Sequence, residues 1–290
     1  MPSLVNMLKS DRPVSSLAKI PETPPNEPDS KVGKLEFDAC AAEEITKLEP
    51  SVINESKFQK LFSANELKLL AQPDYLVKGI LPAIGISACY GPSGSGKSFL
   101  VSDLGINLSF GNDWYGRKTK KCPVTFVVLE GSGGFSKRLQ AWERNFGETI
   151  PETFKVFVAT FSLMNSRDIT ELVTEIKNRG QSSGLVVIDT LNQASPGADE
   201  NSSKDMGLII QNAQRLARET NCHVMLVHHT GKDASKGLRG HSSLIAALDV
   251  ALEVKREGSR RSWCVNKSKD DIDTGQYHFE LNQIVLGYDQ

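Results

Sequence analysis

One short run, GPSGSGKSF at residues 91–99, restricts the possible folds of this chain more than any other feature. It matches the pattern GxxxxGK[ST] and lies between an apolar run (AIGISACY, 83–90) and a stretch with helical spacing (98–110). In such a strand–loop–helix unit, glycines let the backbone turn its N–H groups inward, and the helix dipole adds positive charge at the same point. The run therefore predicts a phosphate-binding loop formed by Gly91, Pro92, Ser93, Gly94, Ser95, Gly96, Lys97, Ser98 and Phe99.

Two side chains of this loop are expected to carry its chemistry. Lys97 is expected to neutralise charge on the β- and γ-phosphates, and Ser98 is expected to ligate Mg²⁺. The predicted cofactors are therefore ATP and Mg²⁺. The alternative is a glycine-rich turn without a function. Such a turn would have to match every fixed position of the pattern by chance and also lie between a strand and a helix.

From about residue 72, short apolar runs alternate with helical segments. The expected strands are 83–90, 124–130, 155–160, 185–189 and 223–229, with helices near 97–110, 134–146, 168–179 and 204–219. Strands that alternate with helices are typical of a parallel sheet covered on both faces. After residue 229, LIAALDVALEVKRE, SWCVNKS, YHFEL and IVLGY are expected to form strands. The fold class is therefore α/β: a P-loop NTPase core with a mainly parallel twisted sheet, flanked by helices and extended by antiparallel C-terminal strands.

The first 58 residues have a different composition from the rest. They contain 7 of the 13 prolines, and no hydrophobic period persists there. We expect 1–58 to be a disordered tail with at most a short helix near 41–48, and 59–290 to be the ATPase domain. Residues 58–70 have helical spacing and could pack on the body or on a neighbouring subunit.

Charge and composition exclude several classes of protein. The net charge of −1 excludes a strongly basic nucleic-acid-binding protein. No apolar run approaches the roughly 18 residues that cross a bilayer, and the N-terminus lacks the apolar stretch of a secretory signal. The five scattered cysteines form no CxxC pair, so a zinc site or a disulfide framework is not expected. We expect a cytoplasmic protein without a membrane partner.

Two carboxylates follow expected strands at the same edge of the sheet. Asp189 ends LVVID, where a carboxylate beside a P-loop suits the Walker B role at Mg²⁺. Its alternative role is to cap the next turn. Thr190 follows it, so no second acid is adjacent, and the other strand-end carboxylate is Glu130, after VTFVVL. Glu130 is the candidate for orienting or deprotonating the attacking water, and its alternative is a solvated loop glutamate.

Polar and basic residues mark the segment after residue 227. His228 and His229 end an expected strand, and a polar group there could sense the γ-phosphate. Because neighbours on a strand point to opposite faces, the pair is a poor metal chelate, and either histidine could be a hydrogen-bonded core residue. Arg239, between small residues, could act as an arginine finger on a neighbouring subunit's ATP, and Lys267 and Lys269 could act in trans in the same way. The alternative for Arg239 is a surface arginine near a phosphate or a carboxylate, and the basic excess of this region could be a solvated face.

The chain from about Asp74 to Asp271 resembles the RecA-fold ATPases typified by the plasmid hexameric replicative helicase RepA and by related phage ATPases. The segments that carry the resemblance are GPSGSGKSF, WYGRKTKKCPVTFVVLEG with Arg138 after it, VVIDTLNQASPGADEN, HVMLVHHTGKD, KGLRGHSSLIAALDVALEV and NKSKDD. His241 interrupts the tighter RGSS form of the plasmid helicase, and residues 1–58 have no counterpart.

The resemblance implies a RecA-like core and a homo-oligomeric ring, usually a hexamer, with ATP between neighbours and 5′→3′ helicase action on single-stranded DNA. Position by position, it implies that Lys97 and Ser98 bind nucleotide and Mg²⁺. It also implies that Glu130 is the catalytic carboxylate, Asp189 the Walker B residue, His229 the sensor-like position and Arg239 the arginine finger.

The DNA is expected to contact the loops after two of the strands, 192–204 and 230–243. Lys204, Lys232 and Lys236 are the candidates for binding DNA phosphates. Neither loop contains an aromatic residue, so recognition through the backbone is expected.

Three functions are compatible with the sequence. The first is a DNA-stimulated ATPase motor, a replicative DNA helicase. The second is a recombination or annealing ATPase that coats single strands. The third is an ATP-gated regulator or loader whose N-terminal tail binds a partner such as a replication protein.

Overall fold

The computed structural model describes residues 2–9, 62–69, 74–230, 242–269 and 275–288. The chain divides into two compact units, one of Met1–Asp11 with Gln72–Gln290 and one of Arg12–Ala71. In the second unit the described element is α1 (Ala64–Leu69), within the stretch expected to be helical. The helix expected near 41–48 lies outside the described residues. Among the helices that are described, none has the length and apolar character needed to cross a membrane.

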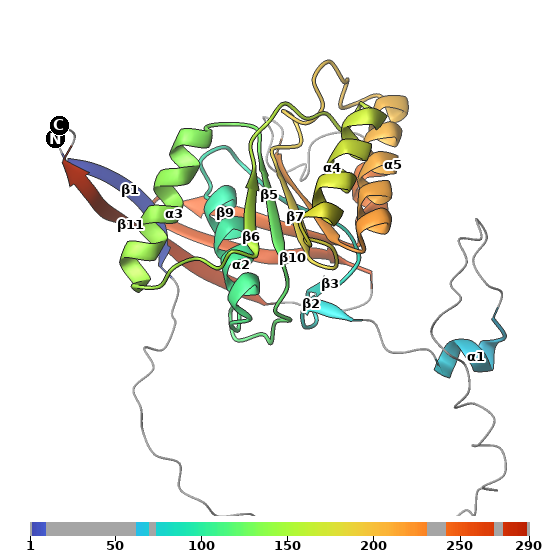
Figure 1. Ribbon diagram of the computed structural model, residues 1–290, viewed down its shortest axis with the longest axis horizontal. Helices are drawn as coiled ribbons and strands as arrows, with labels where there is room; N and C mark the ends of the chain where they lie inside the picture. The colour runs from blue at the N-terminus through green and yellow to red at the C-terminus, as the bar shows by residue number, and fades with distance from the viewer. Residues whose placement is uncertain (1, 10–61, 70–73, 231–241, 270–274, 289–290) are drawn as a thin grey trace, which may run out of the picture. The chain divides into compact units, whose positions relative to one another are not determined.

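The larger unit is built around one mixed sheet, with its strands in the order β1-β11-β10-β9-β4-β8-β7-β5-β6 (Figure 1). Its parallel part runs from β9 to β6, and β9, β10, β11 and β1 pair antiparallel. The bounds are β4 (Gly85–Gly91), β5 (Val124–Val128), β6 (Phe154–Phe157), β7 (Leu185–Asp189), β8 (His223–His229), β9 (Val250–Glu257), β10 (Arg260–Ser268) and β11 (Gln276–Tyr288). A separate small ribbon joins β2 (Tyr75–Val77) to β3 (Leu81–Pro82). The predicted α/β fold, with its antiparallel C-terminal extension, is confirmed.

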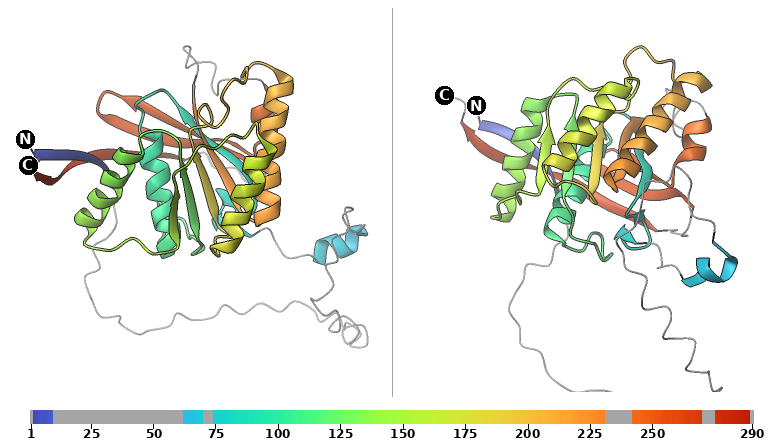
Figure 2. Two further views of the ribbon diagram at one scale, coloured as in Figure 1. Left: turned by 45° about the horizontal axis from the view of Figure 1, so that its top comes forward. Right: turned by 45° about the vertical axis from the view of Figure 1, so that its right-hand side comes forward.

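Two layers of helices cover the sheet (Figures 1 and 2). α2 (Lys97–Phe110) and α3 (Ser132–Phe146) pack in one hydrophobic cluster, whereas α4 (Ser166–Asn178), α5 (Ser203–Thr220) and α6 (Ser242–Ala247) pack in the other. Successive strand residues alternate between the clusters: Val187 of β7 belongs to the first, and Val186 and Ile188 belong to the second. Burial of both faces explains why these strands are continuous apolar runs.

Local sequence explains where the helices begin and end. Asn165 caps α4 by accepting from the N–H of Arg167, and Ser202 caps α5 by accepting from the N–H of Asp205. Helix α2 ends at Gly111 and α3 at Gly147, each in the left-handed conformation that glycine adopts without steric cost. All four helices begin and end within two residues of their expected bounds.

Three expectations about the chain ends need correction. LIAALDVALEVKRE is not one strand, because its start lies in helix α6; Leu244 of this helix and Leu248 just after it both pack in the cluster of α4 and α5. YHFEL and IVLGY form the single strand β11, whose first part pairs with β10 and whose remainder pairs with β1. The strand β1 (Pro2–Lys9) lies inside the segment expected to be disordered, so that expectation is wrong for these residues. The rest of 1–58 lies outside the described residues.

Candidate functional site

The loop between β4 and α2 adopts a conformation that depends on glycine. Gly94 and Gly96 have φ values of 71° and 102°, in the region that side-chain-bearing residues rarely adopt. Gly91 is required for a different reason, since a Cβ atom there would lie 2.1 Å from the carbonyl oxygen of Val254 on the neighbouring strand β9. Strand β9 can therefore approach the end of β4 this closely only because residue 91 has no side chain.

Lys97, the first residue of α2, is held inside this loop. Its Nζ donates to the carbonyl oxygens of Gly91 at 3.0 Å and Pro92 at 2.9 Å, and it lies 3.2 Å from Nδ1 of His229. The side chain is buried, and burial lowers the pKa of its ammonium group. An ammonium group held among neutral acceptors in a desolvated site is well suited to bind an anion.

The carboxylate of Asp189 lies beside the loop, at the end of β7. Burial raises its pKa, while a hydrogen bond from Ser98 and the charge of Arg138 act in the opposite direction. The negative charge of Glu130 raises this pKa as well, so the two carboxylates are close enough to interact. The structure therefore brings Asp189, Ser98 and Glu130 together, as the sequence predicts.

Glu130 and His229 come from the two other strands at this edge. Glu130 is exposed and lies two residues beyond the end of β5, and His229 is the last residue of β8. His228, by contrast, is buried, because adjacent residues of β8 point to opposite faces of the sheet. This geometry agrees with the expectation that the histidine pair does not act as a chelate.

These residues share one cavity of about 590 Å³. Its charged lining consists of four cations and two carboxylates: Lys97, Arg138, Arg256, Arg261, Glu130 and Asp189. Also in the lining are Ser93, Gly94, Gly96, Ser98, Phe99, Gly131, Thr190, Val227, His229 and Leu281. An excess of cations around a glycine-rich loop at the N-terminus of a helix suits a polyphosphate.

The donor set also fits Mg²⁺, a cation that prefers oxygen ligands and binds proteins through few of them. The Ser98 hydroxyl and the Asp189 carboxylate, already joined by a hydrogen bond, are the oxygen ligands that this site would contribute.

Three charged cavity residues were not predicted from the sequence as site residues: Arg138, Arg256 and Arg261. Arg138 projects from α3, and its guanidinium carbon lies 4.7 Å from the centroid of the Phe99 ring. Arg256 and Arg261 come from the β9–β10 hairpin. The available signal was the run KREGSRR (255–261), in which basic residues flank a glycine turn. Nothing local in that run shows that the hairpin reaches the P-loop.

The other predicted residues lie elsewhere. Lys204 is exposed in the first turn of α5 and does not line the cavity. Lys267 donates to the carbonyl oxygen of Ala246 at 3.0 Å, and Lys269 to the carboxylate of Asp249 at 2.8 Å, so both ammonium groups are bound next to the C-terminal end of α6 in their own chain. Arg239, Lys232 and Lys236 lie outside the described residues.

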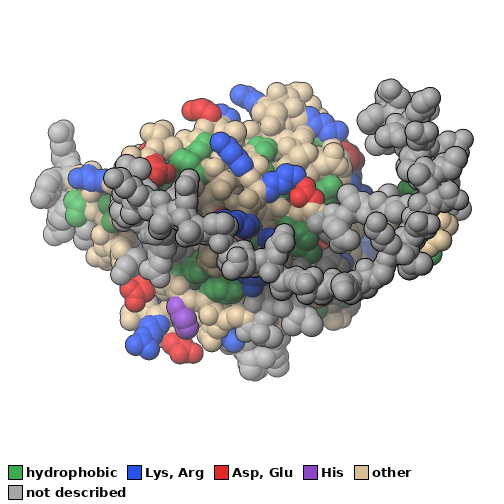
Figure 3. All heavy atoms as spheres, turned by 90° about the horizontal axis from the view of Figure 1, so that it is seen from below, with side chains coloured by type: hydrophobic (Ala, Val, Ile, Leu, Met, Phe, Trp, Pro, Cys, Tyr) green, Lys and Arg blue, Asp and Glu red, His purple; other side chains and the backbone are tan. Residues whose placement is uncertain are grey.

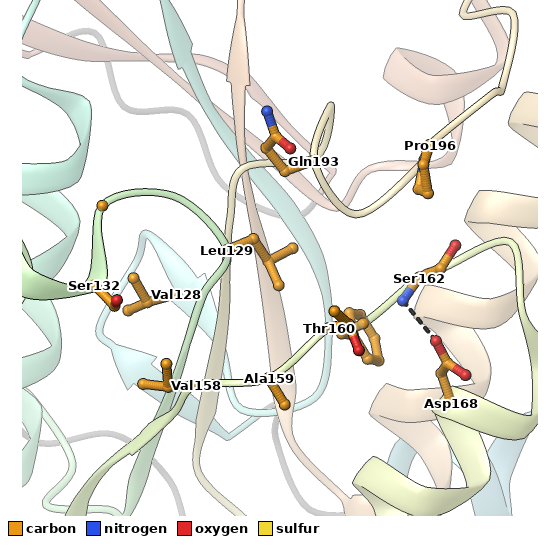
Figure 4. A pocket seen from close by; sticks show the side chains of 12 residues that line it. Val128, Leu129, Ser132, Val158, Ala159, Thr160, Ser162, Asp168, Gln193 and Pro196 are labelled. Carbon is orange, nitrogen blue, oxygen red and sulfur yellow. Dashed lines mark hydrogen bonds between the residues drawn. The ribbon is translucent and has the colours of Figure 1, made fainter.

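A second pocket of about 430 Å³ shares Gly131 with the first (Figure 4). Asp168 is its one charged lining residue, and the Asp168 carboxylate accepts from the backbone N–H of Ser162 at 2.9 Å. Apolar groups such as Leu129, Val158 and Pro196 form much of the remaining wall. Because this lining contains no cation, the phosphate chemistry belongs to the first cavity.

Comparison with known proteins agrees with this assignment. The family described as "AAA domain", a family of RecA-like P-loop ATPases, matches residues 54–235, more than half of the chain. The chain belongs to this family. No curated protein matches the chain.

Two solved structures are similar in fold to this member of the AAA domain family. The RadB recombinase is 20% identical with a TM-score of 0.50, over 69% of this chain and 87% of that one. A KaiC-like protein from the hyperthermophilic archaeon Pyrococcus horikoshii OT3 is 13% identical with a TM-score of 0.50. That match covers 71% of this chain and 89% of the KaiC-like protein. At these identities the similarity concerns the RecA-like fold alone.

Proposed function

We propose that this chain is an ATP-hydrolysing RecA-like motor that acts on single-stranded DNA, as a ring-forming, hexameric replicative helicase of phage or plasmid type. The observation that carries the ATPase part is the cavity in which Lys97, Ser98, Asp189 and Glu130 converge on one glycine loop. The AAA domain family match supports the same reading.

Five residues of the cavity have proposed roles in hydrolysis. Lys97 binds the β- and γ-phosphates through its ammonium group, and Ser98 and Asp189 hold Mg²⁺. When bound, Mg²⁺ neutralises charge that develops on the phosphate oxygens. Glu130 is exposed to the solvent in the cavity, where it orients the attacking water and accepts its proton. Arg138 adds positive charge from α3.

The proposed DNA contacts lie at the carboxyl edge of the parallel strands, where the loops after β7 and β8 begin. Lys204, Lys232 and Lys236 remain the candidates there. Figure 3 shows the side of the molecule opposite the loop that leads into α5; there, basic side chains are interspersed with acidic ones among the described residues, a pattern typical of a solvated surface. Phosphate contacts would make DNA binding and DNA-stimulated turnover sensitive to salt.

The decisive test of the ATPase proposal is turnover by the Lys97→Ala variant, with and without single-stranded DNA. Wild type should hydrolyse ATP and be stimulated by DNA, whereas a folded Lys97→Ala variant should be inactive. Turnover by that variant at the wild-type rate would refute the site.

The ring proposal assigns Arg239 to the ATP of a neighbouring subunit. Arg239→Ala subunits should bind ATP but hydrolyse it slowly. Mixed rings of Arg239→Ala and Glu130→Gln subunits should recover part of the activity, because some interfaces then combine an intact finger with an intact glutamate. Absence of recovery would mean that Arg239 does not act in trans.

A recombination or annealing ATPase is the second candidate, and the fold similarity to the RadB recombinase supports it. Strand displacement on forked DNA separates the two, because a helicase unwinds the fork, whereas a recombination ATPase binds and pairs single strands. ATP turnover that DNA does not stimulate would favour the third candidate, a regulator or loader whose N-terminal segment binds a replication protein.

A further inference from the structure

The β9–β10 hairpin lies against the phosphate-binding loop of its own chain. A guanidinium nitrogen of Arg256 donates to the carbonyl oxygen of Gly94 at 3.3 Å. A Cβ atom built on Gly96 would lie 3.1 Å from Cδ of Arg261 and 3.1 Å from the ring of Phe279 on β11. The hairpin and the following strand therefore cover one side of the loop.

Arg256 and Arg261 are direct cross-strand partners in this hairpin. Residues directly opposite each other in an antiparallel pair project on the same face, and like charges in such a pair are destabilising. The next pair, Arg260 with Glu257, has opposite charges and projects on the other face. The hairpin thus places its unfavourable pair toward the P-loop and its favourable pair away from it.

The two arginines donate hydrogen bonds to neutral backbone carbonyl oxygens, which do not balance the charge of a guanidinium group. Besides Gly94, Arg256 donates to the carbonyl oxygen of Gly258 at 2.8 Å, and Arg261 donates to that of Ser259 at 3.0 Å. Nε of Arg261 is buried without a hydrogen-bond partner. Burial and the charge of Arg256 both lower the pKa of Arg261. A bound anion would accept a hydrogen bond from Nε of Arg261, and it would also reduce the repulsion between the two guanidinium groups.

We propose that the β9–β10 hairpin is a basic cover of the nucleotide site, in which Arg256 and Arg261 bind the polyphosphate of the nucleotide in cis. This inference rests on the proposed ATPase function and adds two phosphate ligands to it. The polyphosphate of the nucleotide is favoured over a DNA phosphate because both arginines line the cavity that holds Lys97 and touch the loop at Gly94 and Gly96.

The test compares Arg256→Ala, Arg261→Ala and Arg261→Lys with the matched control Arg260→Ala. Dissociation constants are measured by titration with a fluorescent ATP analogue and by competition with inorganic tripolyphosphate, both with Mg²⁺. Each alanine variant at Arg256 or Arg261 should bind both probes roughly 10- to 100-fold more weakly, the effect of losing a charge-assisted hydrogen bond. Arg261→Lys keeps the positive charge but has no Nε donor, so it should recover only part of the affinity, and Arg260→Ala should remain within about twofold of wild type.

Melting temperature without nucleotide separates binding from a structural role. Removing one member of a like-charged pair should leave this temperature unchanged or raise it, while the increase caused by ATP becomes smaller. If both alanine variants bound the ATP analogue and tripolyphosphate with wild-type affinity, the proposal would be wrong, whether or not the variants had lost DNA binding. A drop in melting temperature that Arg261→Lys does not reverse would also overturn it. A wild-type protein that binds neither probe would instead refute the proposed function.

Discussion

The ammonium group of Lys97 and the imidazole of His229 lie 3.2 Å apart, so the P-loop lysine and the last residue of β8 share a hydrogen bond. Because an ammonium group only donates, Nδ1 is the acceptor, and the proton of the neutral imidazole is on Nε2. Residue 230 is the last described residue before the segment that contains Arg239. The contact therefore joins the phosphate-binding loop directly to the start of the proposed DNA-binding and arginine-finger segment.

We expect His229→Ala to uncouple ATP turnover from DNA. Lys97 keeps two carbonyl acceptors in this variant, so nucleotide affinity should change by less than about threefold, whereas stimulation of turnover by single-stranded DNA should fall about tenfold. His229→Asn, whose amide oxygen can also accept from Lys97, should keep more of the stimulation. Steady-state turnover across a DNA titration measures both effects. A loss of nucleotide binding as severe as that of Lys97→Ala would contradict the coupling role.

Glu130→Gln should bind ATP normally but hydrolyse it about 10²- to 10⁴-fold more slowly, because the amide cannot accept the proton of the attacking water. Single-turnover hydrolysis and equilibrium nucleotide binding separate the two properties. Glu171→Gln is the matched control, since Glu171 is exposed on α4 outside the cavity. Equal rates for the two variants would exclude Glu130 as the base.

Gly91→Ala should destabilise the protein by about 1–3 kcal/mol or more, because the new methyl group meets the carbonyl oxygen of Val254 at 2.1 Å and must separate β4 from β9. Gly197→Ala is the control: Gly197 has a φ of 78° with nothing within 4 Å of its Cβ position, so it introduces only local strain of about 1 kcal/mol. Chemical denaturation measures both. The interpretation fails if Gly91→Ala costs no more than Gly197→Ala.

His223 should make stability fall in mild acid. It is fully buried, its Nε2 lies 2.7 Å from the Ser87 hydroxyl, and burial lowers its pKa from 6.5 to about 4. Above pH 6.5 the histidine is neutral in both states. Between pH 6.5 and about 4, the unfolded chain takes up a proton that the folded protein does not, so the free energy of unfolding decreases by up to roughly 3 kcal/mol. Denaturation at several pH values should show this slope in wild type and a shallower one in His223→Gln. The same slope in both proteins would assign the effect to other groups.

Local patterns were sufficient for most of the core. The strands at 185–189 and 223–229 occur at the predicted residues, because apolar β-branched runs bounded by turn residues specify buried parallel strands. Helix α6 was missed because a short apolar run such as LIAAL has no decisive period, and only Leu244 and Leu248 packing against α5 makes it helical. Strand β1 was missed because its partner β11 lies at the other end of the chain.

The sequence by itself determined the P-loop pattern, the position of Asp189 at the end of a strand and the α/β alternation, because each of these depends on residues close together in the chain. Only the tertiary structure decided which cations surround the phosphate loop. Arg138 reaches the cavity because it lies over Phe99 of α2, and Arg256 and Arg261 reach it because β9 pairs with β4 beside the loop. Which segments far apart in the sequence come close together is set by the order of the strands in the sheet and by the packing of the helices on it. No local pattern in the sequence encodes either of these.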